Sequence, residues 1–249
     1  MNLPPVAKVA LITGAAKRIG ATIATFFHKR SWSVFIHYRN AEEEALTLVR
    51  ALNSIRPGSS ASYALNLENS QNVPQLIEAV IGHFGRLDLL VNNASSFFPT
   101  KIGSADERAW ESLFSSNLKS PFFLSQAAFP WLQKTQGSVI NITDIHGSRP
   151  LKNYPVYSTA KGGLNALTRS LALEFAPLVR VNAVAPGAIL WPEGGHFDEK
   201  EQQAIIEQTP LKRLGSANDI ARTIYFLAEE APFITGQIIA VDGGRELVL

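Results

Sequence analysis

Short apolar segments of strand length alternate with segments of helical periodicity along most of the chain. Strand-like segments lie at 8–13, 33–37, 60–65, 87–91, 138–143, 180–184 and 237–241. Helical spacing of apolar residues is found between them, at 19–29, 42–55, 73–84, 106–132, 156–175 and 217–229. This order predicts βαβ units, and therefore a mostly parallel sheet with helices on both faces. Because right-handed crossovers restrict the topology, we expect an α/β fold with one doubly wound, Rossmann-type sheet of seven strands.

The sequence contains no linker, low-complexity segment or shift in composition. Residues 1–249 are therefore predicted to form a single domain. The longest irregular stretch, 186–198, contains two glycines and a proline, and the segment 186–209 is expected to form a substrate-side loop or lid. A plain surface loop is the alternative. Pro121 lies inside the helical segment 106–132, which predicts a kink or two separate helices there.

Composition excludes several classes of protein. The chain has no cysteine, so disulfide scaffolds, thiolate metal sites and cysteine nucleophiles are excluded, and we expect a reducing compartment, the cytoplasm. Its five histidines are scattered, so no metal site is expected. The net charge of +2 comes without a basic run, which argues against nucleic acid as a partner. No apolar run approaches the ~20 residues that span a membrane, and the first residues do not resemble a signal peptide.

A glycine-containing turn, TGAAKRIG at 13–20, joins the first predicted strand to the first predicted helix. In such a turn the backbone approaches a phosphate closely, and the helix N-terminus adds partial positive charge. Gly14 is expected to form the turn, and Gly20 to let the helix pack closely on the strand. The residues between them that are expected at the cofactor are Lys17, Arg18 and Ile19. The spacing differs from G-x-G-x-x-G, so an ordinary tight turn is the alternative.

The end of the second predicted strand indicates which dinucleotide the chain binds. An acidic residue about 20 positions beyond the glycine turn binds the ribose diol of NAD, whereas an arginine accommodates the 2′-phosphate of NADP. Arg39 follows this strand, and the first acidic residue, Glu42, lies in the next helix. We expect Arg39 to bind the 2′-phosphate of NADPH or NADP+, with a solvated surface arginine as the alternative. Other residues expected at this end of the cofactor are Lys17, Arg18, His37 and Tyr38.

Tyr157 and Lys161 lie four residues apart near the start of a predicted long helix, so their side chains share one face. A phenol has an ordinary pKa near 10 and is a poor acid or base at neutral pH. A nearby ammonium and a cationic nicotinamide ring would lower the pKa of Tyr157. The pair therefore favours proton transfer by Tyr157 as hydride moves, although Y-x-x-x-K alone is a common pattern.

Taken together, these motifs resemble the short-chain dehydrogenase/reductase family over nearly the whole chain. The matching segments are TGAAKRIG at 13–20, NNA at 92–94, Asn117, Y-x-x-x-K at 157–161, PG at 186–187 and VDGG at 241–244. The resemblance implies that Asn117 supports a water relay to Lys161 and that Lys161 binds the nicotinamide ribose. It also implies that Pro186 and Gly187 pass the nicotinamide carboxamide. For Asn117 alone, a structural role in bending a helix is the alternative.

Three departures from the family pattern narrow the resemblance. Asp144 stands 13 residues before Tyr157, where the family has its catalytic serine. Arg18 replaces the middle glycine of the phosphate loop, and Ser95 replaces the glycine of N-N-A-G. This combination resembles the pteridine reductases. It implies catalysis by Asp144, Tyr157 and Lys161, contacts of Arg18 and Ser95 with cofactor phosphate and pterin, and stacking of Phe97 on the pterin.

The stacking role agrees with the chemistry of a flat, aromatic pterin, since an aromatic pair contributes roughly 1 kcal/mol beyond area burial. Two alternatives are that Asp144 caps a turn and that Phe97 only anchors its loop. Trp191 lies where relatives often have a threonine, and it is expected either to shape the substrate pocket or to close the loop. Residues assigned to the cofactor by their places in the same motifs are Asn66, Leu67, Asn93 and Ala94.

The sequence thus predicts an NADPH-dependent enzyme that reduces a dihydropterin, such as dihydrobiopterin, dihydromonapterin or dihydrofolate, with Tyr157 as the proton donor. A carbonyl or 3-oxoacyl-thioester reductase of the same family is the first alternative, and Asp144 argues against it. A non-catalytic NADP(H) sensor is the second, against which the intact Asn117, Tyr157 and Lys161 argue. The resemblance also implies a homotetramer paired through the helices at 106–132 and 156–175.

Overall fold

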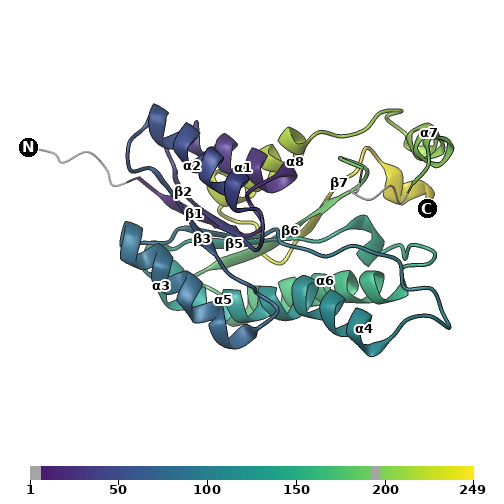
Figure 1. Cartoon of the computed structure of the whole chain (residues 1–249), viewed down its shortest axis with the longest axis horizontal. Coiled ribbons are helices and arrows are strands. Elements are labelled where there is room, and N and C mark those ends of the chain that lie inside the picture. Colours follow the sequence, from purple (N-terminus) through teal and green to yellow (C-terminus); the bar gives the residue numbers. More distant parts are fainter. Residues whose placement is uncertain (1–6, 192–196) are drawn as a thin grey trace, which may run out of the picture.

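The computed structural model describes residues 7–191 and 197–249, and its centre is one seven-stranded sheet (Figure 1). The strands are β1 (Val9–Ile12), β2 (Ser33–Tyr38), β3 (Ser60–Ala64), β4 (Leu89–Asn92), β5 (Ser138–Ile142), β6 (Arg180–Pro186) and β7 (Ile238–Val241). Their order across the sheet is β3-β2-β1-β4-β5-β6-β7, and every neighbouring pair is parallel. The predicted doubly wound α/β sheet is confirmed.

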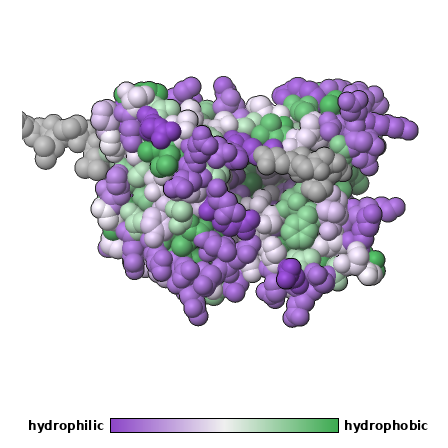
Figure 2. Space-filling view, in the orientation of Figure 1, coloured by the Kyte–Doolittle hydropathy of each residue, from purple (hydrophilic) through white to green (hydrophobic). Residues whose placement is uncertain are grey.

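Helices cover both faces of this sheet. They are α1 (Arg18–His28), α2 (Glu42–Ile55), α3 (Val73–Phe84), α4 (Glu107–Phe114), α5 (Ser120–Thr135), α6 (Pro155–Phe175), α7 (Glu199–Gln208) and α8 (Ala217–Tyr225). Figure 1 shows α1, α2 and α8 on one face and α3, α4, α5 and α6 on the other. The outward sides of the helices are largely hydrophilic, as expected for amphipathic elements (Figure 2).

The helical segment predicted at 106–132 is divided in the structure. A π-helical turn, η2 (Ser115–Lys119), separates α4 from α5, and Pro121 lies in the first turn of α5. A proline has no amide hydrogen to donate to the preceding turn, and π turns occur as single-turn bulges inside α-helices. The chain stays helical through this turn, so two separate helices are not formed, and a kink at Pro121 stays a prediction.

Helix α7 lies inside the segment 186–209, which the sequence analysis treats as a loop or lid. Asp198 caps its N-terminus: the Asp198 carboxylate accepts the Glu201 amide, while the Glu201 carboxylate accepts the Asp198 amide. No residue of α7 is fully buried, so the helix has no strong apolar stripe that periodicity would detect. The residues that suggested a mobile lid, Pro192, Gly194 and Gly195, lie outside the described residues.

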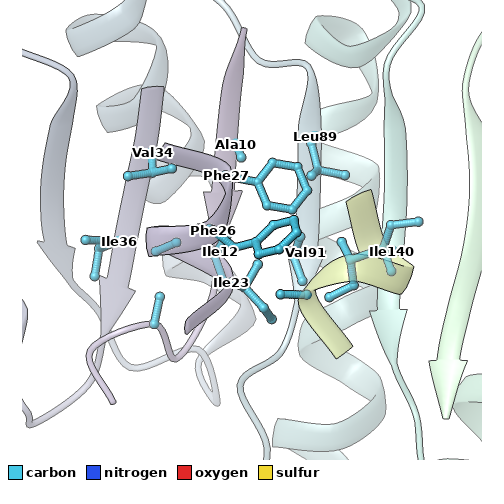
Figure 3. Close-up of a cluster of buried hydrophobic side chains, with 14 of the residues drawn as sticks. Ala10, Ile12, Ile23, Phe26, Phe27, Val34, Ile36, Leu89, Val91 and Ile140 are labelled. Carbon is cyan, nitrogen blue, oxygen red and sulfur yellow. The ribbon is translucent and has the colours of Figure 1, made fainter. Parts of the chain in front are cut away.

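The hydrophobic core has two layers, one on each face of the sheet. Because strand side chains alternate, Ala10 and Ile12 of β1 face α1, whereas Val9 and Leu11 face the opposite helices. Figure 3 shows the first layer, in which Phe27 of α1 lies over the central strands. Burial of both faces explains the continuously apolar strands of the sequence. The core therefore holds the carboxyl ends of the strands in one fixed row.

The strand order reverses beside β1, since the chain crosses from β3 back over the sheet to β4, on the other side of β1. At such a switch point the loops after neighbouring strands diverge and leave a crevice at the carboxyl ends. The loops that follow β1, β2, β4 and β5 carry most of the predicted site residues. That the chain forms one domain stays a prediction.

Candidate active site

A cavity of about 640 Å³ opens at the carboxyl ends of the strands. Most predicted site residues line it: Gly14, Lys17, Arg18, Ile19, Gly20, His37, Arg39, Asn66, Leu67, Asn93, Ala94, Ser95, Phe97, Asp144, Tyr157, Gly187 and Trp191. Four others, Tyr38, Asn117, Lys161 and Pro186, lie outside this lining. Figure 2 shows a hollow near the middle of the molecule, between the two layers of helices. The structure thus gathers residues from six separate loops around one volume.

The glycine turn after β1 has the geometry that its sequence predicts. Gly14 adopts a left-handed conformation with φ of 61°, which glycine tolerates best. A Cβ atom on Gly20 would lie 2.4 Å from the carbonyl oxygen of Gly14 and 2.8 Å from Cα of Ala15. Helix α1 has no acidic residue in its first turn, so the partial positive charge at its N-terminus is not offset there. The turn is therefore built for close packing beside an anion.

Asn93 ties the end of β4 to this turn. Its side-chain amide donates to the carbonyl oxygens of Thr13 (2.8 Å) and Gly14 (3.1 Å). The Thr13 hydroxyl in turn accepts the backbone N–H groups of Asn93 and Ala94. The NNA segment therefore holds the two strands that flank the switch point in register with each other.

Arg18 occupies the position of the expected loop glycine and keeps a glycine-like conformation, with φ of 54°. Such a conformation is uncommon for a residue with a side chain. One guanidinium nitrogen, Nη2, donates to the carbonyl oxygen of Trp191 at 2.7 Å, so Arg18 links the glycine turn to the segment after β6. It therefore bridges two segments of the cavity lining.

His37, which is expected at the cofactor, forms hydrogen bonds on both of its ring nitrogens. Its Nδ1 accepts the backbone N–H of Gly14 at 3.2 Å, and its Nε2 lies 2.9 Å from the carbonyl oxygen of Leu65, which needs a proton on Nε2. Burial lowers the pKa of His37 to about 4, although the hydrogen bond to Leu65 raises it. His37 is therefore neutral at pH 7 and supports the glycine turn without adding positive charge.

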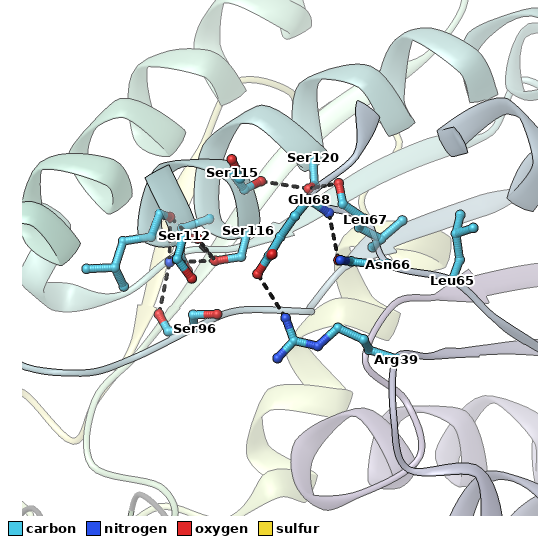
Figure 4. A network of polar contacts seen from close by, with 12 residues as sticks. Arg39, Leu65, Asn66, Leu67, Glu68, Ser96, Ser112, Ser115, Ser116 and Ser120 are labelled. Carbon is cyan, nitrogen blue, oxygen red and sulfur yellow. Dashed lines mark hydrogen bonds and ion pairs between the residues drawn. The ribbon is translucent and has the colours of Figure 1, made fainter. Parts of the chain in front are cut away.

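Two of the cations expected near a 2′-phosphate, Arg39 and Lys17, are already paired with carboxylates. Arg39 lies 2.8 Å from Glu68, which follows β3, and Lys17 lies 2.6 Å from Glu44 of α2. Figure 4 shows the Glu68 side chain directed toward the Arg39 guanidinium. Exposed ion pairs of this kind contribute only about 0–1 kcal/mol. An incoming phosphate can therefore replace either carboxylate at a low cost.

Asp144 and Tyr157 meet at the opposite end of the cavity. The Tyr157 hydroxyl donates to Oδ2 of Asp144 at 2.7 Å. The other carboxylate oxygen, Oδ1, accepts the backbone N–H of His146 at 2.8 Å and caps the turn η3 (Ile145–Gly147). The predicted cap and the predicted partner of the tyrosine are thus both present, one on each oxygen. The cap fixes the orientation of the carboxylate toward Tyr157.

Lys161 lies behind this pair and is buried. Its ammonium donates to the carbonyl oxygen of Ile142 at 2.8 Å and lies 5.8 Å from the centre of the Tyr157 ring. Burial lowers the pKa of Lys161 to about 8, against the charge of Asp144, which raises it. Burial raises the pKa of Tyr157 well above its ordinary value, and the charge of Asp144 and its hydrogen bond act in the same direction. At pH 7 the tyrosine therefore holds its proton and the lysine is mostly charged.

Asn117 lies in the π turn η2. Its side-chain nitrogen donates to the carbonyl oxygens of Leu113 and Ser96, both at 2.9 Å. The first contact satisfies a helix carbonyl at the π turn, which agrees with the structural alternative. Its side-chain oxygen, however, is buried and accepts no hydrogen bond from any described residue. The side-chain nitrogen of Asn117 is therefore used within the fold, and its side-chain oxygen is available to another hydrogen-bond donor.

Aromatic rings form the wall between these two ends. Phe97 stacks on Tyr154 with ring centres 4.6 Å apart, and it meets the Tyr157 ring edge-on at 4.8 Å. Trp191 lies 6.2 Å from Phe197, both measured between ring centres, and both rings line the cavity. Tyr154 and Phe197 were not among the predicted site residues. The contact of Tyr154 with Phe97 depends on the tertiary fold, because the two residues come from the loops after β5 and β4.

Gly187 shows why a glycine follows β6. Its amide donates to the carbonyl oxygen of Val241, and a Cβ atom there would lie 2.7 Å from Cα of Asp242. The PG segment at 186–187 and the VDGG segment at 241–244 are therefore packed closely against each other. Other cavity residues that the sequence analysis did not single out include Glu68, His146, Ile205 and Arg245.

Neither a metal-binding cluster nor a membrane-spanning helix is found among the described residues. Within residues 7–191 and 197–249, no group of three or more His, Cys, Asp or Glu side chains is arranged to hold a metal ion. Over the same residues, no helix is both long and apolar enough to cross a membrane.

Known proteins resemble this chain over almost its whole length. A family model described as Enoyl-(Acyl carrier protein) reductase matches residues 14–246. Pteridine reductase 1 of Leishmania tarentolae is 36% identical over 288 aligned positions, which cover 99% of each chain. A 3-oxoacyl-(acyl-carrier-protein) reductase of Thermotoga maritima is 33% identical, with 95% of this chain and 97% of its own length covered. The corresponding reductase of Staphylococcus epidermidis is 35% identical at similar coverage. The chain therefore belongs to the short-chain dehydrogenase/reductase family of NAD(P)H-dependent oxidoreductases.

Proposed function

We propose that this chain is an NADPH-dependent reductase of dihydropterins. The observation that carries the proposal is the 2.7 Å hydrogen bond from Tyr157 to Asp144, with Phe97 beside it. A serine in place of Asp144 would donate a hydrogen bond to a substrate carbonyl, whereas an ionised carboxylate only accepts. A pterin ring offers N–H donors for such an acceptor and a flat surface for an aromatic ring.

The residues present fit a dinucleotide. The glycine turn and the N-terminus of α1 suit its pyrophosphate, and Arg39 with Lys17 suits a 2′-phosphate. The family resemblance assigns Lys161 to the nicotinamide ribose. When bound, the reduced nicotinamide supplies hydride to the substrate.

Tyr157 supplies the proton in the proposed reaction. Reduction of a ring C=N bond places hydride on carbon and a proton on nitrogen, so the donor must be protonated beforehand. The raised pKa of Tyr157 meets this requirement. The charge of Lys161 stabilises the phenolate that forms, and Asp144 stands in position to return a proton from solvent. The free side-chain oxygen of Asn117 suits a water relay toward Lys161.

The experiment measures NADPH oxidation by the purified protein with dihydrobiopterin, dihydromonapterin, dihydrofolate and an acetoacetyl thioester. Oxidation with a pterin and none with the thioester is the expected result. Turnover of the thioester alone would replace the proposal with a 3-oxoacyl reductase, the candidate that the relatives from Thermotoga and Staphylococcus favour. Tight NADPH binding without any turnover would indicate a non-catalytic sensor.

Phe97→Ala tests the stacking role. We expect pterin affinity to fall about tenfold, because an aromatic contact and its buried area are lost together. NADPH affinity, measured by fluorescence titration, should change much less. Phe98→Ala is the matched control, since it removes the neighbouring ring. Equal losses for pterin and NADPH would show that Phe97 only anchors its loop.

A homotetramer and a cytoplasmic location remain part of the proposal. Size-exclusion chromatography with light scattering tests the first, and fractionation of cells tests the second.

A further inference from the structure

We propose that Arg245 binds a carboxylate on the side chain of the substrate, so that the enzyme prefers pterins with an acidic tail, of the dihydrofolate type. This inference rests on the proposed function. It concerns the side of the cavity that follows β7, whereas the glycine turn, Arg39 and Asp144 follow β1, β2 and β5. Neither the family motifs nor the catalytic scheme assigns a role to this arginine.

Arg245 is a buried cation on the cavity wall. It opens the last turn of the chain, η5 (Arg245–Val248), directly after the VDGG segment. Arg245 is only 7% exposed, yet it lines the cavity together with Ile205 of α7. An arginine with this little exposure is uncommon unless its charge has a partner.

The guanidinium has few partners. Its Nη1 donates to the carbonyl oxygen of Ile205 at 3.0 Å, and this is its one side-chain hydrogen bond to the described residues. The charge of Asp242 acts on this guanidinium and raises its pKa, whereas burial lowers it more strongly. The Asp242 carboxylate, however, is used locally: its two oxygens accept the backbone N–H groups of Gly244 and Glu246. Arg245 forms no ion pair within the described ranges 7–191 and 197–249.

The chemistry of the remaining donors points to an anion. A guanidinium has five N–H donors in a planar fork, and it keeps its charge at any physiological pH. Nε and Nη2 of Arg245 donate to no described residue. A carboxylate satisfies two parallel donors of such a fork at once. A buried charge without such a partner is unfavourable, so an anion that enters the cavity gains an unusually strong contact.

The surroundings favour a substrate carboxylate over a cofactor phosphate. The two cations that suit phosphates, Lys17 and Arg39, follow β1 and β2, whereas Arg245 follows β7 at the opposite edge of the sheet. The cavity lining also includes the aromatic rings of Trp191 and Phe197 and the side chain of Ile205, whose carbonyl oxygen accepts a hydrogen bond from Arg245. An aromatic spacer between a pterin ring and a carboxylate fits such a wall. Dihydrobiopterin and dihydromonapterin carry short, neutral, hydroxylated tails and make no ion pair there.

Arg245→Gln is the test, because glutamine keeps donors while removing the charge. We expect the ratio of kcat/KM for dihydrofolate to kcat/KM for dihydrobiopterin to fall about tenfold or more, as for a lost charged hydrogen bond. The change should appear in KM, since the tail is remote from the reacting atoms. Arg213→Gln is the matched control: Arg213 is an exposed arginine beyond α7, and its loss should leave the ratio unchanged.

A binding measurement keeps the test independent of turnover. p-Aminobenzoylglutamate, titrated by calorimetry into NADPH-loaded protein, should bind the wild type and bind Arg245→Gln at least about tenfold more weakly. If no pterin is reduced but this probe binds through Arg245, the proposed function has failed and the anion site stands. If pterins are reduced but the probe does not bind, the inference is overturned and the proposed function stands. A loss of NADPH affinity in Arg245→Gln would reassign the arginine to a cofactor phosphate. An equal loss with every substrate would show that it only holds α7 in place.

Discussion

The two ends of the cavity hold their charges in opposite ways. At the rim, Arg39 and Lys17 are exposed and already paired with Glu68 and Glu44. At the inner end, Tyr157 and Lys161 are buried and bonded to Asp144 and to backbone. Exposed ion pairs are screened and exchange partners readily, whereas burial shifts pKa values and resists change. The exposed rim is therefore suited to selecting a cofactor by its charge. The buried inner end is suited to fixing the protonation states that the chemistry requires.

Tyr157→Phe should produce the largest effect, because it removes the proposed acid from the inner end. We expect kcat to fall about 10²- to 10⁴-fold, the usual contribution of a positioned acid. NADPH affinity should stay within about threefold, since the phosphate contacts lie at the rim. Steady-state rates with the best pterin and fluorescence titration of NADPH check both values. Full activity in this variant would show that Tyr157 is not the proton donor.

The pKa of Lys161 predicts how the inner end responds to pH. Burial lowers this pKa to about 8, so the ammonium is present below pH 8 and is lost as the pH rises through that value. Tyr157 stays protonated over this range because its pKa is raised. Reductive kcat/KM should therefore fall tenfold per pH unit above a midpoint within about one unit of 8. A flat profile from pH 6 to 9.5 would show that the charge of Lys161 is not needed.

Arg39→Asp tests the rim. The change reverses the charge opposite the 2′-phosphate, so NADPH affinity should fall about tenfold or more while NADH affinity holds or rises. The ratio of the two dissociation constants is the measurement. An unchanged ratio would place the 2′-phosphate elsewhere on the protein.

Glu68→Gln should have the smallest effect and the opposite sign. Glu68 occupies Arg39 before the cofactor arrives, so its removal should tighten NADPH binding about two- to fivefold, which corresponds to one exposed ion pair. NADH binding should not change. Glu78→Gln on the exposed side of α3 removes the same charge away from the cavity and serves as the control. Weaker NADPH binding in Glu68→Gln would mean that the carboxylate positions Arg39 instead of competing for it.

Much of the fold was predictable because its signals are local. Helix α2 and helix α3 have the predicted bounds, since an apolar stripe marks each along its length. Helix α7 was missed because it buries no residue completely, and its one strong signal is the capping pair of Asp198 and Glu201. Capping alone is a weaker guide than periodicity when the helix lies at the edge of the molecule.

The site was predictable in part. The glycine turn and the Tyr157–Lys161 pair could be identified because each lies within one element. The neutral state of His37 was not predictable, since it depends on contacts with Gly14 and Leu65 from two other loops. The same holds for Glu68, whose carboxylate meets Arg39 only because β2 and β3 are neighbours in the sheet.

The sequence by itself determined the order of the strands and of the helices other than α7, the place of the glycine turn and the family, because these follow from local periodicity and short motifs. The tertiary structure alone decided which carboxylates face Arg39 and Lys17, how deeply Lys161 is buried and that Arg245 lines the cavity. The physical reason is that charge and proton affinity depend on distance and on exclusion of water. Both are set only after residues far apart in the chain are packed around one sheet.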